Sequence, residues 1–172
     1  LVSEYKDSFA DLPVVIVPSA GHTVEWIKGE AVRQEADIIF VDYLGLIQPS
    51  NGKKDKSYEI VSDISKELHT LAQSELITVV ALQQQNREGA GKASMHSLRD
   101  SSQIESDADA ILILTIPKDG EGMTERDRSQ EYLPMWEESL NIAKNKDGDR
   151  VTISYTFDGQ HQKFYERETR YT

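Results

Sequence analysis

Short apolar runs in the first half of the chain alternate with segments in which apolar residues recur at helical spacing. The runs "LPVVIVP" (residues 12–18), "DIIFVD" (37–42) and "TVVAL" (78–82) are rich in β-branched residues, which favours buried strands. Between them, Thr23 can cap one helix and Ser57 can cap a longer one. Apolar strands separated by amphipathic helices predict a parallel sheet covered on both faces.

The helical spacing also predicts which side chains of these two helices face the core. We expect the first helix, which extends to about residue 35, to bury Val24, Ile27, Ala31 and Ala36. We expect the second helix to bury Ile60, Val61, Ile64, Leu68, Leu71 and Ala72.

The second half of the chain predicts a change of architecture. "AILILTI" (residues 110–116) is a fourth predicted strand, and the charged segment 118–138 lacks a clear period, which indicates an excursion or mobile loop. Asp-Gly pairs at 147–148 and 158–159 then separate alternating segments, a pattern typical of hairpins. We therefore expect one domain over residues 1–166 that finishes antiparallel, followed by a polar tail at 167–172.

Composition narrows the classes of function. The 172 residues include no cysteine, which excludes disulfides and Cys-ligated zinc. The formal net charge of -11 means that any nucleic-acid surface is local rather than a basic face of the whole domain. We find no apolar stretch of about 18 residues and no leader pattern, so we expect a cytoplasmic protein without a membrane partner.

Two polar positions follow neighbouring predicted strands and carry the candidate chemistry. Asp42 ends one strand, and Gln84 follows the next. Because ligands bind at the carboxyl ends of parallel strands, a carboxylate there can hold Mg²⁺ against a nucleotide phosphate and an amide can contact the γ-phosphate. The alternatives remain open at this point: Asp42 caps the next turn, or the glutamines belong to a solvated loop.

Six segments, in order, resemble the RecA-like motor domain of DnaB-type replicative helicases. "LPVVIVPSAGHTVEWI" looks like the segment before the acidic motif, "IIFVDYLGLI" like that motif, and "VVALQQQNR" like the family's S-Q-L-N-R sensor. "SLRDSSQIESDADAILIL" is similar to L-R-E-S-G-S-I-E-Q-D-A-D, "AKNKDG" to K-x-R-N-G, and "YTFDGQHQKFYE" to the closing hairpin. The resemblance implies an α/β, RecA-like P-loop NTPase core: a mostly parallel central sheet with helices on both faces, finishing in antiparallel hairpins.

The resemblance also implies roles for individual residues. Asp42 supports Mg²⁺ and its water, Gln84 senses the γ-phosphate of ATP, and Lys144 and Lys146 reach the ATP of a neighbouring subunit. It further implies an ATP-dependent helicase that unwinds duplex DNA as a homo-hexamer, with primase and a helicase loader as further partners. A loop that touches single-stranded DNA matches Arg99, Asp100 and Ser102.

The sequence departs from the family pattern at several positions. No G-x-x-x-x-G-K-[ST] phosphate cradle occurs; in the family the cradle and the catalytic glutamate lie upstream, so we expect them to precede Leu1 and this chain alone to be inactive. Lys146 stands where the family has arginine, and Arg150 is a candidate substitute. Ser102 and Gly45 replace a glycine and a glutamine of the family pattern.

The sequence also allows other interpretations of the function and of two aspartates. Within the same fold, a recombinase-like or clock-type ATPase would assemble and switch without unwinding duplex DNA. A non-catalytic module that keeps the ring surface without a nucleotide site is a different class. Asp107 and Asp109 invite a metal interpretation, but carboxylates at a helix-to-strand junction are more often solvated.

Overall fold

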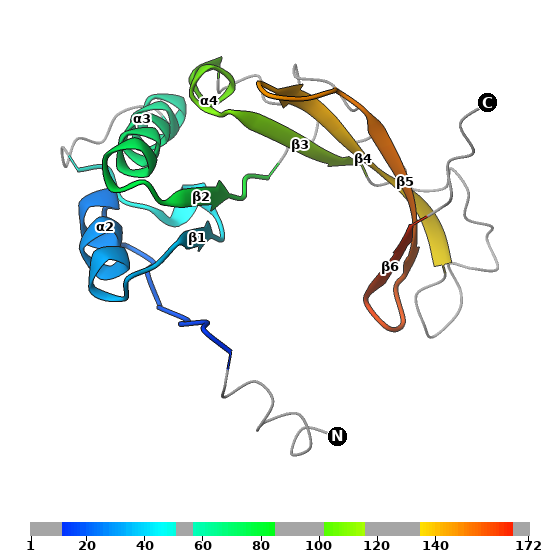
Figure 1. Cartoon of the computed structure of the whole chain (residues 1–172), viewed down its shortest axis with the longest axis horizontal. Helices are drawn as coiled ribbons and strands as arrows, with labels where there is room; N and C mark the ends of the chain where they lie inside the picture. Colours follow the sequence, from blue (N-terminus) through cyan, green and yellow to red (C-terminus); the bar gives the residue numbers. More distant parts are fainter. Residues whose placement is uncertain (1–11, 51–56, 85–101, 116–134, 167–172) are drawn as a thin grey trace.

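The computed structural model describes residues 12–50, 57–84, 102–115 and 135–166, which contain two sheets together with helices (Figure 1). A two-stranded sheet has the order β1-β2, and a four-stranded sheet has the order β3-β4-β5-β6. The elements in chain order are α2 (Val24–Arg33), β1 (Ile38–Val41), the 3₁₀ turn η1 (Leu44–Leu46), α3 (Ser57–Glu75), β2 (Thr78–Ala81), α4 (Ser102–Asp107), β3 (Ala110–Thr115), β4 (Met135–Asn145), β5 (Thr152–Asp158) and β6 (Lys163–Glu166).

Helix α2 begins at the predicted cap. The hydroxyl of Thr23 accepts a hydrogen bond from the backbone N–H of Trp26 at 3.3 Å, which satisfies one of the free donors of the first turn. Val24, Ile27 and Ala31 are buried on one face, as their spacing predicts. The first predicted helix is therefore confirmed, although it ends at Arg33 and Ala36, beyond its end, is only partly buried.

Helix α3 supplies the other half of this core. Ile64, Leu68 and Leu71 are buried, and they form one cluster with the buried residues of α2, which confirms the predicted face. The other three residues predicted for this face are only partly buried: Ile60, Val61 and Ala72. After the last helical residue, Leu76 has a positive φ of 56°, and the N–H of Ile77 donates to the carbonyl of Ala72 at 3.2 Å. This is a Schellman ending without the usual glycine.

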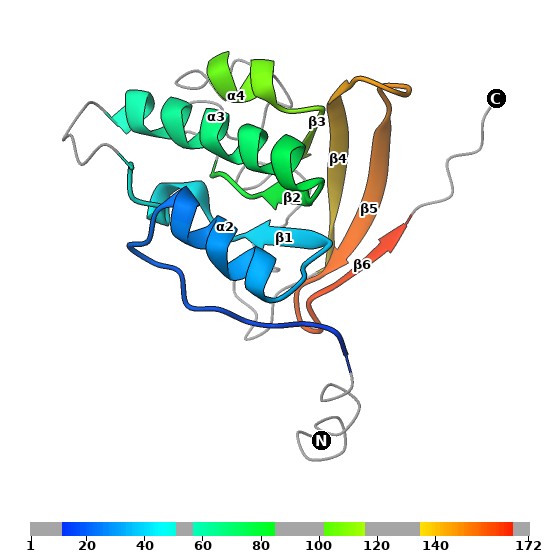
Figure 2. The same cartoon turned by 60° about the vertical axis from the view of Figure 1, so that its left-hand side comes forward.

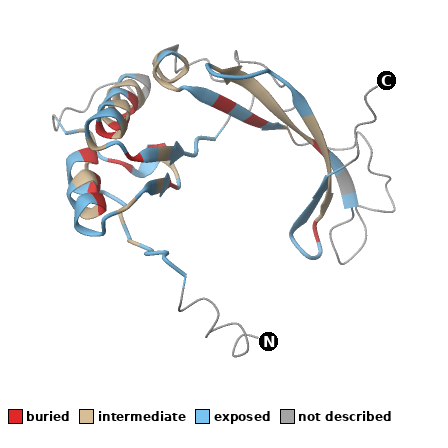
Figure 3. Ribbon diagram, viewed as in Figure 1, coloured by how far each residue is buried: buried red, intermediate tan, exposed pale blue. Residues whose placement is uncertain are grey.

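Strands β1 and β2 run parallel and are covered on one face. Ile38 lies opposite Thr78, and Val41 lies opposite Ala81. Helices α2 and α3 lie on the same side of this pair (Figures 1 and 2), and buried residues gather between the helices and the strands (Figure 3). Phe40 is 71% exposed. The prediction of helices on both faces is therefore wrong for the described residues.

The run at residues 12–18 is not a strand. It has no regular secondary structure, and Ile16 in it is 90% exposed. A strand needs a neighbour that satisfies its backbone donors and acceptors, and none of the described strands pairs with this run. The apolar, β-branched composition of the segment predicted a preference for a strand, but it did not predict which strand would pair with it.

The remaining strands form an antiparallel meander. The turns at 147–148 and 158–159 join β4 to β5 and β5 to β6, so both predicted hairpins are confirmed. β3 also pairs antiparallel, with β4. Among the described strands, only β1 and β2 are parallel, so the predicted mostly parallel sheet is not what this part of the chain shows.

Strand β4 also corrects the boundary of the predicted excursion. Most of segment 118–138 lies outside the described residues, but its last residues, from Met135, belong to β4. Glu138 is 6% exposed there. The pattern of apolar residues did not predict this part of the strand, because the segment contains charged residues.

Candidate functional site

The segments that follow β1 and β2 lie side by side at the carboxyl edge of the parallel pair. The N–H of Leu82 donates to the carbonyl of Val41 at 3.0 Å, and the N–H of Leu44 donates to the carbonyl of Leu82 at 3.0 Å. These bonds extend the ladder beyond both strands. Asp42 and Gln84, predicted as partners, therefore leave adjacent strands at the same edge, and both are exposed.

The turn after Asp42 is built so that its carboxylate stays exposed. Leu44 and Ile47 are buried in the helix-covered core, which fixes η1 against the sheet. The residue that caps η1 is Tyr43, and no side chain makes the capping hydrogen bond. The interpretation of Asp42 as a cap for the next turn is thus not supported by this geometry.

Gly45 has a local reason to be glycine. A Cβ added at this position would lie 2.7 Å from the ring of Tyr43, which is closer than carbon atoms approach one another without a shift. The tyrosine ring occupies the space that a side chain at residue 45 would need. A side chain at residue 45 would therefore require the Tyr43 ring, which lies beside the candidate carboxylate, to shift.

The donor chemistry at this edge fits magnesium held against a phosphate. Mg²⁺ binds oxygen ligands and is commonly held by one or two protein carboxylates together with substrate phosphates. Asp42 supplies one such carboxylate. Within the described residues no group of three or more His, Cys, Asp or Glu side chains is placed to hold a metal by itself, so a cation here would need the phosphate as a ligand.

The predicted lysine pair lies elsewhere, where α4 meets β3 and β4. The ammonium of Lys144 donates to the carbonyl of Glu105 at 2.5 Å and to that of Ser106 at 3.3 Å. Lys146 forms an ion pair with Asp109. In the described part of the chain, no hydrogen bond or ion pair joins either lysine to the Asp42 edge. Within one subunit, the described structure therefore does not join Lys144 and Lys146 to the edge formed by Asp42 and Gln84.

The other predicted site residues are placed only in part. Arg99 and Asp100 lie outside the described residues, and Ser102 is the first residue of α4. Arg150 is exposed in the segment that leads into β5. The roles assigned to these residues stay predictions.

Two carboxylates near α4 have partners that sequence reasoning missed. Asp107 is half-buried and accepts hydrogen bonds from the hydroxyl of Ser65 at 2.8 Å and from the amide of Gln103 at 2.7 Å, so the expectation of a solvated carboxylate is wrong for it. Asp109 is exposed, as expected, but it pairs with Lys146. The spacing of Gln103 and Asp107, four apart on one helix, was the available signal.

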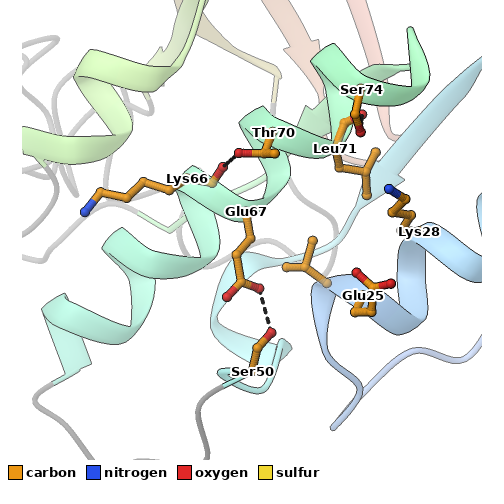
Figure 4. A pocket seen from close by; sticks show the side chains of 9 residues that line it. Glu25, Lys28, Ser50, Lys66, Glu67, Thr70, Leu71 and Ser74 are labelled. Atoms are coloured by element: carbon orange, nitrogen blue, oxygen red, sulfur yellow. Dashed lines mark hydrogen bonds between the residues drawn. The ribbon is translucent and has the colours of Figure 1, made fainter.

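A hollow between α2 and α3 is separate from this edge (Figure 4). Its volume is about 490 Å³, and its walls include Glu25, Lys28, Lys66 and Glu67. Ser50 donates to Glu67 across it at 2.7 Å. The charges of its walls alternate in sign, so the hollow selects neither anions nor cations.

Comparison with known proteins gives one family. The model of the DnaB-like helicase C terminal domain family matches residues 2–166. The chain is 30% identical over 172 residues to the replicative DNA helicase DnaC of Bacillus subtilis, covering 95% of this chain and 36% of that protein. It is 34% identical over 134 residues to the replicative DNA helicase DnaB of Treponema pallidum, covering 77% of this chain and 27% of that protein. The chain thus spans about a third of the length of these curated relatives.

Solved structures are similar over nearly all of the chain. A DnaB-like replicative helicase described with its interactions with primase superposes with a TM-score of 0.80 at 25% identity, over 96% of this chain and 41% of that one. A second solved structure, an ATPase domain, gives a TM-score of 0.80 at 26% identity, over 97% of this chain and 59% of that one. None of the helices within the described residues has both the length and the apolarity that crossing a membrane requires.

Proposed function

This chain belongs to the DnaB-like helicase C-terminal domain family, and we propose that it forms the distal part of the ATP-driven motor of a ring-shaped replicative DNA helicase. The family is one of ATP-using helicases, and the resemblance recognised in the sequence is confirmed. The observation that carries the proposal is the shared edge where Asp42 and Gln84 leave parallel strands. Nucleotide sites of open parallel sheets occupy this position.

The finer fold is part of the same proposal. We infer that β1 and β2 are two strands of a RecA-like central sheet whose other strands come from further residues of the protein. The uncovered face supports this, because Ile38 is 52% and Phe40 71% exposed, and large apolar side chains on a sheet face are commonly covered in a folded domain.

The residues at the edge have separable tasks. The carboxylate of Asp42 would hold Mg²⁺, and the amide of Gln84 would donate to a γ-phosphate oxygen and move when that oxygen leaves. ATP with Mg²⁺ supplies the phosphoryl group whose loss drives the motor. Gln84 lies three residues beyond the end of β2, so its backbone is free to shift without breaking the ladder of that strand.

The lysine pair would act on the ATP of a neighbouring subunit. Within the described residues, no hydrogen bond or ion pair joins Lys144 or Lys146 to the Asp42 edge of their own subunit, which agrees with action across an interface. A cation supplied in trans stabilises charge on the transferring phosphoryl group. Arg150 is a second candidate for the same task, since it is exposed and follows the same turn.

The remaining partners follow from the same proposal. Single-stranded DNA would pass through the centre of a homo-hexamer, in contact with Arg99, Asp100 and Ser102. Six copies of one short loop can follow a phosphate backbone while the subunit as a whole stays acidic. We place this helicase in the cytoplasm, with primase and a loader as partners; one similar helicase structure is described together with its interactions with primase.

A strand-displacement assay tests the proposed function. The full-length protein that contains this chain is incubated with a forked duplex, ATP and Mg²⁺, and release of the displaced strand is measured. We expect release that depends on ATP. ATP hydrolysis stimulated by single-stranded DNA without any displacement would instead favour a recombinase-like or clock-type ATPase.

A subunit-mixing experiment tests the action in trans. Rings made only of Asp42→Asn subunits, or only of Lys144→Ala subunits, are expected to lose ATP turnover. Mixed rings contain interfaces in which an intact Asp42 faces an intact Lys144, so mixing should restore part of the turnover. No recovery in mixed rings would refute the assignment of Lys144 to the neighbouring site.

A further inference from the structure

The C-terminal end of α4 and the lysine pair form one connected unit. Lys144 donates to the carbonyls of Glu105 and Ser106, which lie in the last turn of α4, where free carbonyls and the helix dipole favour a cation. Lys146 pairs with Asp109, two residues after the helix. Both lysines are therefore held by groups at the exit of α4.

An irregularity in the β3-β4 ladder places Lys144 on this side of the sheet. Ile111 lies opposite Lys144, but the next residue, Leu112, lies opposite Ile142, so one residue of β4 is extra. Residues opposite each other in an antiparallel pair share a face, so Lys144 shares the face of buried Ile111, whereas Ile142 shares the face of exposed Leu112. Bulges of this kind redirect a side chain beside a functional site.

A backbone hydrogen bond joins the two chain segments at the same end of the β3-β4 pair. The N–H of Lys146 donates to the carbonyl of Asp109 at 3.0 Å, so the backbones of the two residues are joined as well as their side chains. The hydrogen bond from Lys146, together with its positive charge, keeps the pKa of the Asp109 carboxyl below its ordinary value. An aspartate is already charged at neutral pH with its ordinary pKa, so the geometry of the pair, and not this shift, makes Asp109 a partner for Lys146.

Helix α4 is in turn attached to α3. Ser65, which is 9% exposed on α3, donates to Asp107 of α4 at 2.8 Å, and Ile104 packs against the cluster that α2 and α3 form. Helix α4 is therefore attached to the core by a hydrogen bond and by apolar packing, so the groups at its end that hold both lysines have a rigid support.

We propose that Asp109 and the C-terminal carbonyls of α4 are positioning groups for Lys146 and Lys144, the cations that would be offered to the neighbouring nucleotide. This inference rests on the proposed function. It adds that Asp109, which the sequence suggested only as a metal ligand or a solvated carboxylate, orients the lysine that replaces the family's arginine. A lysine has a flexible stem and gives one point of charge, so it requires a partner that restricts its direction.

The position of the ion pair points to orientation more than to stability. Lys146 and Asp109 are 48% and 69% exposed, and exposed pairs of this kind contribute little to the free energy of folding. Losing the pair should leave the domain folded. It should nevertheless enlarge the range of directions available to the ammonium of Lys146, and small misplacement of a catalytic group slows a reaction strongly.

The test uses Asp109→Asn in the full-length helicase, with Asp158→Asn as the matched control. Asp158 is an aspartate of the same sheet that pairs with a nearby base, His161, and it has no contact with α4 among the described residues. We expect Asp109→Asn to lower kcat for DNA-stimulated ATP hydrolysis about tenfold with KM for ATP unchanged, and Asp109→Glu to restore part of the loss. Asp158→Asn should behave as wild type.

A second readout does not depend on ATP turnover. Lysine acetylation followed by mass spectrometry, in the absence of nucleotide, reports how free each amine is. Asp109→Asn is expected to raise the labelling rate of Lys146 severalfold and to leave that of Lys163, an exposed lysine of β6, unchanged. Labelling of Lys146 that equals the wild-type rate would overturn the proposal.

The combined variants separate failure of this inference from failure of the proposed function. If Asp109 acts through Lys146, the double variant Asp109→Asn with Lys146→Ala should be no slower than Lys146→Ala alone. Additive losses, or a faster enzyme after Asp109→Asn, would overturn the positioning role. If Lys144→Ala and Lys146→Ala both leave turnover intact, the action in trans fails, and the positioning role that rests on it fails with it.

Discussion

The attachment of α4 to α3 gives a prediction whose size follows from the structure. Ser65→Ala removes the hydroxyl that donates to the Asp107 carboxylate at 2.8 Å. A hydrogen bond to a charged group contributes about 1.5 to 3 kcal/mol. Because Asp107 keeps its bond from Gln103 and is only half-buried, we expect the lower end, about 1.5 kcal/mol, to be lost from the local stability of α4.

Hydrogen exchange measured by mass spectrometry is the assay, on peptides that cover residues 102–108 of the full-length protein. A loss of about 1.5 kcal/mol corresponds to roughly tenfold faster exchange of the α4 amides. Ser74→Ala is the matched control: it removes a hydroxyl from the same helix, and that hydroxyl bonds within α3 to the carbonyl of Leu71. Unchanged exchange in Ser65→Ala, or α4 amides that already exchange at the unprotected rate in wild type, would show that the Ser65 hydroxyl does not hold α4 against α3.

Three further predictions concern stability and titration. Ile64 is 1% exposed, and changing it to alanine should lower the free energy of unfolding by about 2 to 5 kcal/mol. In the same denaturation experiment, Val32→Ala at a 51% exposed position should lower it by less than about 0.5 kcal/mol. Leu76→Gly should raise the unfolding free energy by about 0.5 to 1 kcal/mol, because glycine fits the positive φ of 56°; a loss of stability would contradict this. The hydrogen bond from Lys146 keeps the pKa of Asp109 below the ordinary 3.8, so the stabilisation by this pair is complete above that pH and is lost as the pH falls further. In Lys146→Ala, carboxyl NMR should show Asp109 titrating at higher pH. An unchanged titration would show that the pair does not exist in solution.

Local signals predicted the helical half of the core well. The cap at Thr23 and the 3.6-residue spacing of apolar side chains depend only on residues within one helix, and Ile27 and Leu68 are buried where that spacing placed them. The shared edge of Asp42 and Gln84 was also predictable, since a strand, a helix and a second strand form a parallel unit.

Long-range pairing was not predictable in the same way. The run at residues 12–18 and strand β3 have similar apolar composition, yet only β3 has a partner among the described strands, and that partner is antiparallel. The contact of Lys146 with Asp109 depends on the β3-β4 register and its irregularity. Periodicity along one segment does not encode which second segment pairs with it.

ATP hydrolysis by two aspartate variants tests whether the edge shared by Asp42 and Gln84 is the nucleotide site of the motor. Asp42 follows the carboxyl end of β1, and Asp37 precedes the amino end of the same strand. Turnover in the full-length protein is measured with single-stranded DNA present. We predict that Asp42→Asn abolishes turnover while Asp37→Asn keeps it. Wild-type turnover in Asp42→Asn, or equal losses in both variants, would show that this edge is not the nucleotide site.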